Sequence, residues 1–235
     1  MKKVALILLL CCFLTGISFS QSKPDANEDA SGFWQIANTR LLPVYGPLAE
    51  YIVNKYNLAE KAGIGIDLGS GPGNLIIELC RRTKQMFWIN ADINPAFFPL
   101  FLDSAKKNYL EKRVDTVFAD AQALPFKDNY ADIIVSRGSF QFWKDKRLAF
   151  SEIYRVLKTG GIAFIGRGFS ENLPVEIAKN IRERTDGGPR YDVVGTAEEL
   201  RQIMKILSIN EYKIQMPKPP DSEGINYGIW LEFYK

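Results

Sequence analysis

The sequence predicts a single α/β domain in which helices cover both faces of a mostly parallel, doubly wound β-sheet. Short apolar runs alternate with amphipathic stretches along most of the chain, a pattern typical of βαβ units. A glycine-rich turn follows the first apolar run, and an acidic residue stands at the end of each of the first three runs. The 235 residues are 46% hydrophobic and 24% charged, which is the composition of a globular domain with a substantial core.

The helices and strands are expected in a regular order. Residues 33–58 have apolar side chains at helical spacing, with breaks at Pro43 and Pro47. Strands are then expected at residues 64–68, 86–91, 114–119, 130–136 and 162–166. The intervening helices are expected at residues 74–82, 95–109 and 146–157, and they are followed by helices at 173–184 and 196–209 and by closing strands at 211–216 and 227–234. The carboxyl ends of the parallel strands then form one edge of the sheet, where ligands bind in such folds.

Residues 1–20 have the three parts of a secretory signal peptide. Two lysines precede an apolar run, and Ser18 and Ser20 stand at the spacing of a cleavage site. The run is short for a membrane span, which needs ~20 residues. The segment is therefore expected to be a signal peptide or a membrane anchor, with a buried helix of the fold as the alternative. Residues 21–32 are expected to form a polar linker, and residues 33–235 the folded domain.

The composition excludes several kinds of site. The chain contains no histidine, so no histidine-based acid, base, triad or metal ligand is available. Of its three cysteines, Cys11 and Cys12 lie in the leader and only Cys80 remains in the body. Neither an internal disulfide nor a cysteine-rich metal site is expected, and no metal is predicted. The net charge of +3 leaves no strong basic footprint for nucleic acid.

The glycine-rich turn is the most informative motif. Gly69, Gly71 and Gly73 alternate with other residues directly after the first strand, and Asp67 stands at the end of that strand. Such a turn needs residues that tolerate unusual dihedrals and leave bare backbone beside a ligand. The G-x-G-x-G spacing differs from the G-x-G-x-x-G of dinucleotide sites. It fits a cofactor with an amino-acid tail, whose ammonium group Asp67 would receive; a tight loop without a ligand is the alternative.

Two further acidic residues end the next two strands. Asp92 is expected to accept hydrogen bonds from both hydroxyls of a ribose, with an ordinary helix cap as the alternative. Asp120 is expected to accept a hydrogen bond from an adenine amino group. Three strand ends in the correct order, each with the expected acid or glycines, form a stronger signal than any one of them.

On these residues the chain resembles the class I S-adenosylmethionine-dependent methyltransferases of the small-molecule branch. The resemblance covers about residues 33–235 and includes the Asp-Ala-x-x-Leu-Pro-Phe form of the third strand end. It implies a Rossmann-like sheet of seven strands with the last strand antiparallel, and S-adenosyl-L-methionine as the cofactor. Ile93 would pack on the adenine. The cofactor-binding residues that the resemblance implies are Asp67, Gly69, Ser70, Gly71, Gly73, Asp92, Ile93, Asp120 and Ala121.

The run after the fourth strand stands where the methyl acceptor usually meets the cofactor in this family. Arg137 is expected to hold a carboxylate or phosphate of the substrate, and Phe140, Phe142 and Trp143 to form an apolar or cation-binding wall. The alternative for the aromatic residues is packing beneath the next helix. Tyr45 is expected to close over the cofactor, with a helix junction as the alternative. The residues assigned to the substrate are Tyr45, Ser136, Arg137, Phe140 and Trp143.

Together these observations predict an enzyme that transfers a methyl group from S-adenosyl-L-methionine to a small-molecule acceptor by in-line displacement. No residue is assigned as a general base. The alternatives are a module that binds the cofactor without turnover and a nicotinamide-dependent reductase on the same sheet. The leader predicts a membrane-associated or exported protein, whereas the cytosolic origin of the cofactor favours a cytoplasmic one.

Overall fold

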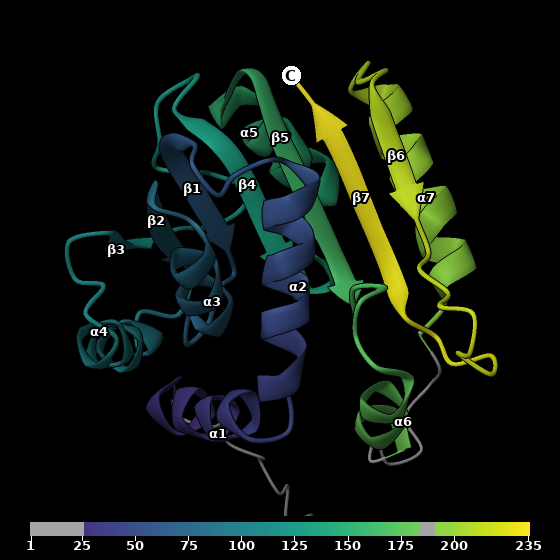
Figure 1. Ribbon diagram of the computed structural model, residues 1–235. Helices are drawn as coiled ribbons and strands as arrows, with labels where there is room; N and C mark the ends of the chain where they lie inside the picture. Colours follow the sequence, from purple (N-terminus) through teal and green to yellow (C-terminus); the bar gives the residue numbers. More distant parts are fainter. Residues whose placement is uncertain (1–25, 184–190) are drawn as a thin grey trace, which may run out of the picture.

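The computed structural model describes residues 26–183 and 191–235, and in this part of the chain seven strands form one sheet (Figure 1). The strand order is β3-β2-β1-β4-β5-β7-β6. The strands are β1 (Ala62–Leu68), β2 (Gln85–Asp92), β3 (Val114–Phe118), β4 (Ala131–Arg137), β5 (Leu157–Gly168), β6 (Tyr212–Gln215) and β7 (Gly228–Tyr234). The helices are α1 (Ala26–Asn38), α2 (Leu42–Lys55), α3 (Asn74–Arg82), α4 (Phe97–Lys107), α5 (Lys146–Val156), α6 (Val175–Glu183), α7 (Val193–Ile206) and the short 3-10 helix η1 (Phe140–Phe142).

The last strand, β7, is the antiparallel member of the sheet. It lies between β5 and β6 and pairs with both in the antiparallel sense. The pairs β1–β2, β1–β4, β2–β3 and β4–β5 are all parallel. The predicted doubly wound, Rossmann-like sheet of seven strands, mostly parallel and closed by an antiparallel strand, is therefore confirmed.

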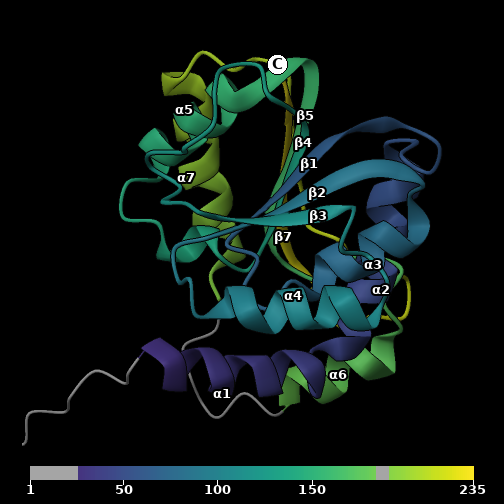
Figure 2. The same cartoon turned by 90° about the vertical axis from the view of Figure 1, so that its left-hand side faces the viewer.

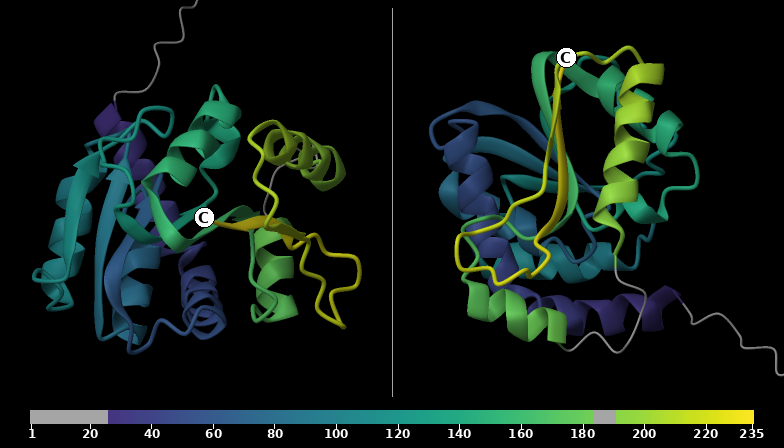
Figure 3. Two further views of the ribbon diagram at one scale, coloured as in Figure 1. Left: turned by 90° about the horizontal axis from the view of Figure 1, so that it is seen from above. Right: turned by 90° about the vertical axis from the view of Figure 1, so that its right-hand side faces the viewer.

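Different helices bury the two faces of the sheet (Figure 3). Helices α2, α3 and α4 pack on one face, in a cluster that contains the fully buried Trp88. Helices α5 and α7 pack on the other face, in a cluster that contains Phe150. Gly65 in β1 makes room for the indole, because a Cβ at Gly65 would lie 2.3 Å from the ring of Trp88. Burial on both faces explains why the parallel strands read as continuous apolar runs.

Helices α1 and α6 take a different place from the other helices. Both lie beyond the carboxyl ends of the parallel strands, below the sheet in Figures 1 and 2. This is the edge where the loops after β1, β2, β3 and β4 come together, because parallel strands end on the same side. The two helices therefore stand next to the part of the fold where a ligand is expected.

The structure differs from the sequence-based expectation near the start of the domain. Helix α1 begins at Ala26, inside the segment expected to be a polar linker, and its buried Ala30 and Ala37 pack against the domain. The expected break at Pro47 is wrong, since α2 continues through it. Pro43 lies in the first turn of α2, where the missing N–H costs nothing, and the buried residues after Pro47 hold the helix against the sheet.

The leader lies outside the described residues, so its predicted role as a signal peptide or membrane anchor stays a prediction. Within residues 26–183 and 191–235, no helix is both long enough and apolar enough to cross a membrane.

Candidate cofactor and acceptor site

A cavity of about 600 Å³ opens at the carboxyl edge of the sheet. Its walls come from the loops after the first four strands and from side chains of α1 and α2. Most of the residues predicted to form the site line it: Tyr45, Asp67, Gly69, Ser70, Gly71, Asp92, Ile93, Asp120, Ala121, Arg137 and Trp143. Residues from four separate loops are thus brought to one place, as the strand-end pattern predicted.

The glycines of the turn after β1 all have left-handed backbone conformations. The φ angles of Gly69, Gly71 and Gly73 are 68°, 56° and 74°. A Cβ at Gly69 would lie 2.3 Å from Cβ of Ser139, and a Cβ at Gly73 would lie 2.1 Å from the ring of Phe101 in α4. Gly69 therefore allows the loop after β1 to approach the loop after β4, whereas Gly73 serves helix packing. The predicted cofactor contact of Gly73 is not supported, because Gly73 does not line the cavity.

The end of β2 holds the glycine turn in place. Oδ2 of Asp92 accepts a hydrogen bond from the backbone N–H of Gly71 at 2.7 Å, and Nδ2 of Asn90 donates to the carbonyl of Gly71 at 3.0 Å. Oδ1 of Asp92 accepts from the backbone N–H of Asn94 at 2.8 Å. Helix α4 begins only at Phe97, so the alternative that Asp92 is a helix cap is wrong. Burial raises the pKa of Asp92, while its hydrogen bonds to backbone N–H groups oppose that rise.

Asp67 is the most deeply buried acid of the cavity, with 2% of its surface exposed. Its Oδ1 atom and the Oγ atom of Ser70 have no hydrogen-bond partner among the described residues. Burial raises the pKa of Asp67 to about 7, against the opposing influence of Ser70 and Arg137. A buried carboxylate oxygen without a partner is costly unless a ligand supplies a donor. The position fits the predicted role of receiving an ammonium group.

The loop after β3 borders the cavity beyond Asp92. Oδ1 of Asp120 accepts hydrogen bonds from the backbone and side chain of Gln122, at 2.9 and 3.1 Å. Ile93 faces the cavity from the neighbouring loop and is 60% exposed. An exposed apolar side chain beside an acceptor group is the arrangement expected for an adenine ring, which needs a packing surface and a partner for its amino group.

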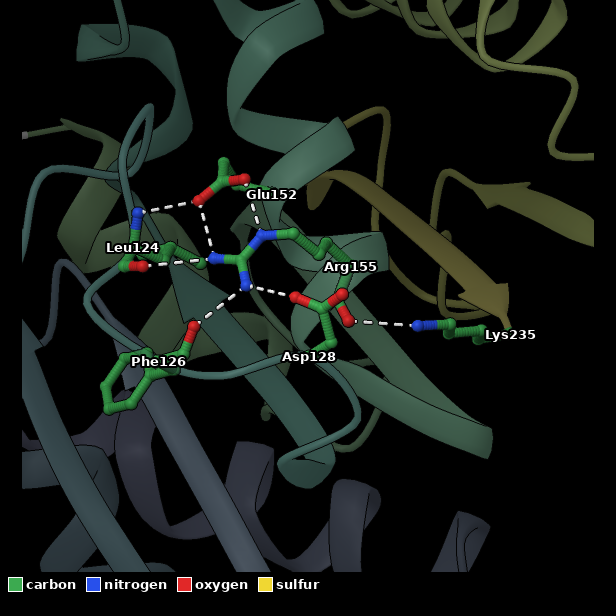
Figure 4. Close-up of polar contacts among 6 residues, drawn as sticks. All are labelled: Leu124, Phe126, Asp128, Glu152, Arg155 and Lys235. Atoms are coloured by element: carbon green, nitrogen blue, oxygen red, sulfur yellow. Dashed lines mark hydrogen bonds and ion pairs between the residues drawn. The ribbon is translucent and has the colours of Figure 1, made fainter.

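Two residues of α5 fix the loop after β3 from behind (Figure 4). Oε2 of Glu152 accepts from the backbone N–H of Leu124 at 2.9 Å. Arg155 donates to the carbonyls of Leu124 and Phe126 at 3.1 and 2.8 Å, and it forms ion pairs with Glu152 and Asp128. The sequence predicted a helix in this part of the chain but did not reveal that it clamps the loop.

The run after β4 divides between the cavity and the core. Phe142 is 78% exposed and lines the cavity with Trp143. Phe140 is buried in the core, and the ring of Trp143 meets the ring of Phe150 in α5 at 5.6 Å between centroids. The predicted substrate contact of Phe140 is therefore wrong, and the alternative of packing beneath the next helix holds for it.

Ser136 also lies away from the cavity. It is 1% exposed, and its hydroxyl lies 2.7 Å from the hydroxyl of Ser139, which donates to the carbonyl of Leu68 at 3.0 Å. A direct contact of Ser136 with the substrate is not supported, because its buried hydroxyl is within hydrogen-bond distance of Ser139 behind the cavity surface. Ser139, which the sequence-based assignment omitted, is the residue that faces the cavity.

Arg137 and Tyr45 meet at one end of the cavity. The guanidinium carbon of Arg137 lies 5.5 Å from the centroid of the Tyr45 ring, and Nε donates to the carbonyl of Gly168 at 3.3 Å. Burial raises the pKa of Tyr45, which keeps this phenol protonated at neutral pH. Tyr45 projects into the cavity wall from α2, which runs without a break from Leu42 to Lys55, so Tyr45 does not lie at a helix junction.

Several lining residues had no local signal in the sequence. Phe33 reaches the cavity from α1, where its ring packs edge-on against Phe97 of α4 at 6.0 Å. The contact joins segments far apart in the chain, which periodicity does not reveal. The other lining residues that the assignment omitted include Asn94, Phe97, Gln122, Ser139 and Lys144.

Comparison with known proteins agrees with this geometry. A family model described as a methyltransferase domain matches residues 66–165. The crystal structure of a protein from Methanococcus maripaludis, provisionally assigned as an S-adenosyl-L-methionine-dependent methyltransferase, is 32% identical, with a TM-score of 0.78. The match covers 92% of this chain and 96% of that one. The chain belongs to the S-adenosyl-L-methionine-dependent methyltransferase family.

Curated relatives in this methyltransferase family match a shorter part of the chain. The 2-methyl-6-phytyl-1,4-hydroquinone methyltransferase of Arabidopsis thaliana is 36% identical over 98 residues, which are 42% of this chain and 28% of that protein. The ubiquinone/menaquinone biosynthesis C-methyltransferase of Vibrio campbellii is 36% identical over 97 residues, which are 41% of this chain and 38% of that protein. The aligned part is thus about a third of the length of these relatives.

The residues around the cavity fit the cofactor of this family, S-adenosyl-L-methionine. The unpartnered Oδ1 atom of Asp67 suits an ammonium group, and Gly69, Ser70 and Gly71 of the neighbouring turn line the cavity beside it. Asp92 reaches the cavity from β2, where the ribose is expected, and Ile93 and Asp120 stand where the adenine is expected.

Proposed function

We propose that the protein transfers a methyl group from S-adenosyl-L-methionine to a small-molecule acceptor. The observation that carries the proposal is that one cavity has two kinds of lining. Asp67, Asp92 and the glycine turn are polar groups suited to the cofactor, and Phe142 and Trp143 add an aromatic surface suited to an acceptor. An enzyme that aligns two reactants needs both kinds of lining, whereas a module that only binds the cofactor needs one.

An aromatic, apolar acceptor fits the aromatic surface of the cavity. The two curated relatives are named for methylation of quinol or quinone compounds, and we propose an acceptor of that type for this chain. Phe142 offers a largely exposed ring, and Trp143 offers an indole whose position is fixed by Phe150. Flat aromatic acceptors stack well on such rings.

The cofactor supplies an electrophilic methyl group, so the protein mainly aligns the reactants and excludes water. Phe33 from α1 and Tyr45 from α2 contribute aromatic side chains to the wall of the cavity. The absence of histidine from the chain means that a proton released by the acceptor has to go to another group or to water. The described geometry assigns no such group.

A mass-spectrometric assay tests the proposed reaction. The full-length protein is incubated with cofactor that carries a trideuterated methyl group and with a panel of hydroquinones and other small phenols. We expect a labelled methyl group in one of these acceptors, together with S-adenosyl-L-homocysteine. Tight cofactor binding without transfer to any acceptor of the panel would favour the alternative of a binding module, and it would contradict the proposed acceptor class.

The nicotinamide-dependent reductase is the weaker alternative, since the turn after β1 lacks the glycine spacing of dinucleotide sites and the chain belongs to a methyltransferase family. Fluorescence titration with a reduced nicotinamide cofactor is expected to show no binding. Saturable binding in the micromolar range would revive that alternative.

We also propose that the N-terminal segment associates the protein with a membrane. The support is the apolar run behind Lys2 and Lys3, together with exposed apolar side chains on the adjoining α1, namely Trp34 and Ile36. A lipophilic acceptor of the quinol type would be found in the same membrane. Fractionation of cells that express the full-length chain is expected to place it with the membranes, and recovery of the uncleaved chain in the soluble fraction would contradict this.

A further inference from the structure

A buried carboxylate and a partly buried guanidinium face the cavity from neighbouring strands. Asp67 lies near the end of β1 and Arg137 at the end of β4, and the strands pair so that Asp67 lies opposite Val135. Each charge acts on the other. Arg137 opposes the rise that burial causes in the pKa of Asp67, and Asp67 opposes the fall that burial causes in the pKa of Arg137.

The charges of Asp67 and Arg137 influence each other but do not form an ion pair. No salt bridge in the described part of the chain includes Asp67 or Arg137. Asp67 keeps one oxygen without a partner. Because no ion pair joins them, both charges are available to a ligand that carries a group of each sign.

The contacts that hold Arg137 leave its charge uncompensated. The carbonyl of Gly168 and the ring of Tyr45 are neutral partners, which orient the guanidinium but do not neutralise it. Arg167 places a second positive charge nearby and adds to the lowering of the pKa of Arg137 that burial causes. A planar, partly buried guanidinium in such a position is suited to a carboxylate, which it can bind with two parallel hydrogen bonds.

An α-amino acid carries an ammonium group and a carboxylate on the same carbon atom, and this matches the pair formed by Asp67 and Arg137. We propose that Arg137 binds the α-carboxylate of the methionine part of S-adenosyl-L-methionine, while Asp67 receives the ammonium group. The inference rests on the proposed function, because it assumes that this cofactor occupies the cavity. It moves Arg137 from the acceptor, where the sequence placed it, to the cofactor. Phe142 and Trp143 then remain as the wall for the acceptor.

Calorimetric titration of the full-length chain with two compounds tests the proposal. One is S-adenosyl-L-methionine, and the other is its decarboxylated form, which lacks only the carboxylate. The wild-type protein is expected to bind the decarboxylated compound about 10- to 100-fold more weakly, as for the loss of a charge-assisted pair. Arg137→Gln is expected to lose about as much affinity for the complete cofactor and to discriminate little between the two compounds. Arg137→Lys keeps the charge without the planar fork and should be intermediate.

Arg167→Gln is the matched control. It removes the same charge from the neighbouring strand, but Arg167 does not line the cavity. The ratio of the affinities for S-adenosyl-L-methionine and for its decarboxylated form is therefore expected to stay at the wild-type value. Circular dichroism shows whether each variant is folded.

Different failures have different meanings. A wild-type protein that binds both compounds equally, or an Arg137→Gln variant that keeps the wild-type ratio, overturns the assignment of Arg137 and leaves the guanidinium for an anionic group of the acceptor. A folded wild-type protein that binds neither compound overturns the proposed function itself.

Discussion

The side chain of Asp92 is hydrogen-bonded to the backbone of Gly71, with 2.7 Å between Oδ2 and the amide nitrogen. The bond joins the end of β2 to the turn after β1. One carboxylate therefore has two tasks: it shapes the glycine turn and it faces the cavity where the ribose is expected.

Replacement of Asp92 should impair both tasks. Asp92→Asn keeps one acceptor oxygen, so it can hold either the turn or the ribose but not both in the same way. We expect cofactor affinity to fall about 10- to 100-fold, as for the loss of hydrogen bonds to a charged group. Calorimetry measures the affinity, and Asp115→Asn on the exposed side of β3 is the control. Unchanged affinity in Asp92→Asn would exclude the ribose contact.

The pH dependence of cofactor affinity should follow the ionisation of Asp67. Burial raises its pKa to about 7, and only the ionised carboxylate attracts an ammonium group. The charged or titratable groups that act on it are Asp92, Tyr45 and Arg137. As the pH falls through 7, the carboxylate takes up a proton and the affinity falls. We expect binding at pH 6 to be about tenfold weaker than at pH 7.5, where the cofactor's own ammonium group is still mostly charged.

Asp67→Asn is the control for this pH effect. The variant should bind the cofactor weakly at both pH values and show a flat profile between them. A wild-type affinity that is equal at pH 6 and pH 7.5 would mean that Asp67 does not meet the ammonium group.

Gly69→Ala tests the close approach of the loops after β1 and β4. The variant has two penalties, the strain of a left-handed conformation and a Cβ 2.3 Å from Ser139. Gly138→Ala has the first penalty only, since its φ is 77° and nothing lies within 4 Å of the added Cβ. We expect a loss in free energy of unfolding of about 1 kcal/mol for Gly138→Ala and about 2 to 4 kcal/mol for Gly69→Ala. Equal losses in urea unfolding would show that Ser139 moves aside freely.

Arg155→Gln tests the clamp behind the loop after β3. The change removes the hydrogen bonds to the carbonyls of Leu124 and Phe126 and both ion pairs of the guanidinium. We expect a loss of about 2 to 3 kcal/mol in the free energy of unfolding and weaker cofactor binding, because the loop carries Asp120. Arg201→Gln removes an exposed pair with Glu198 on α7 and should cost less than about 0.5 kcal/mol. A loss of stability in Arg155→Gln without any loss of cofactor affinity would show that the clamp does not position the loop for the adenine.

The strand ends could be predicted because each has a local signature. Asp67, Asp92 and Asp120 each follow an apolar run, and parallel strands bring such residues to one edge without further information. The antiparallel last strand was expected from the family resemblance, whereas the order of the strands in the sheet was not predicted.

The direction of side chains in the run after β4 could not be predicted. Phe140 and Phe142 are two residues apart in one aromatic run, and either could face inward. A single turn of 3-10 helix, η1, places Phe140 in the core and Phe142 at the cavity. The choice depends on the backbone of that turn and on the space beneath α5, which the local sequence does not specify.

Contacts between distant segments were also beyond local reasoning. Phe33 reaches the cavity only because α1 crosses the carboxyl edge of the sheet, and Arg155 meets Leu124 only because α5 packs behind the loop. Pro47 was expected to break a helix on local grounds, but the packing of α2 against the sheet outweighs the lost hydrogen bond.

Calorimetric titration of the folded, full-length wild-type protein with S-adenosyl-L-methionine is the most direct test of the cofactor site. We expect one binding site with a dissociation constant on the order of 1 μM, or about −8 kcal/mol, and loss of that binding in Asp92→Ala. A folded wild-type protein that binds no S-adenosyl-L-methionine would contradict the cofactor site built from Asp67, Asp92 and the glycine turn.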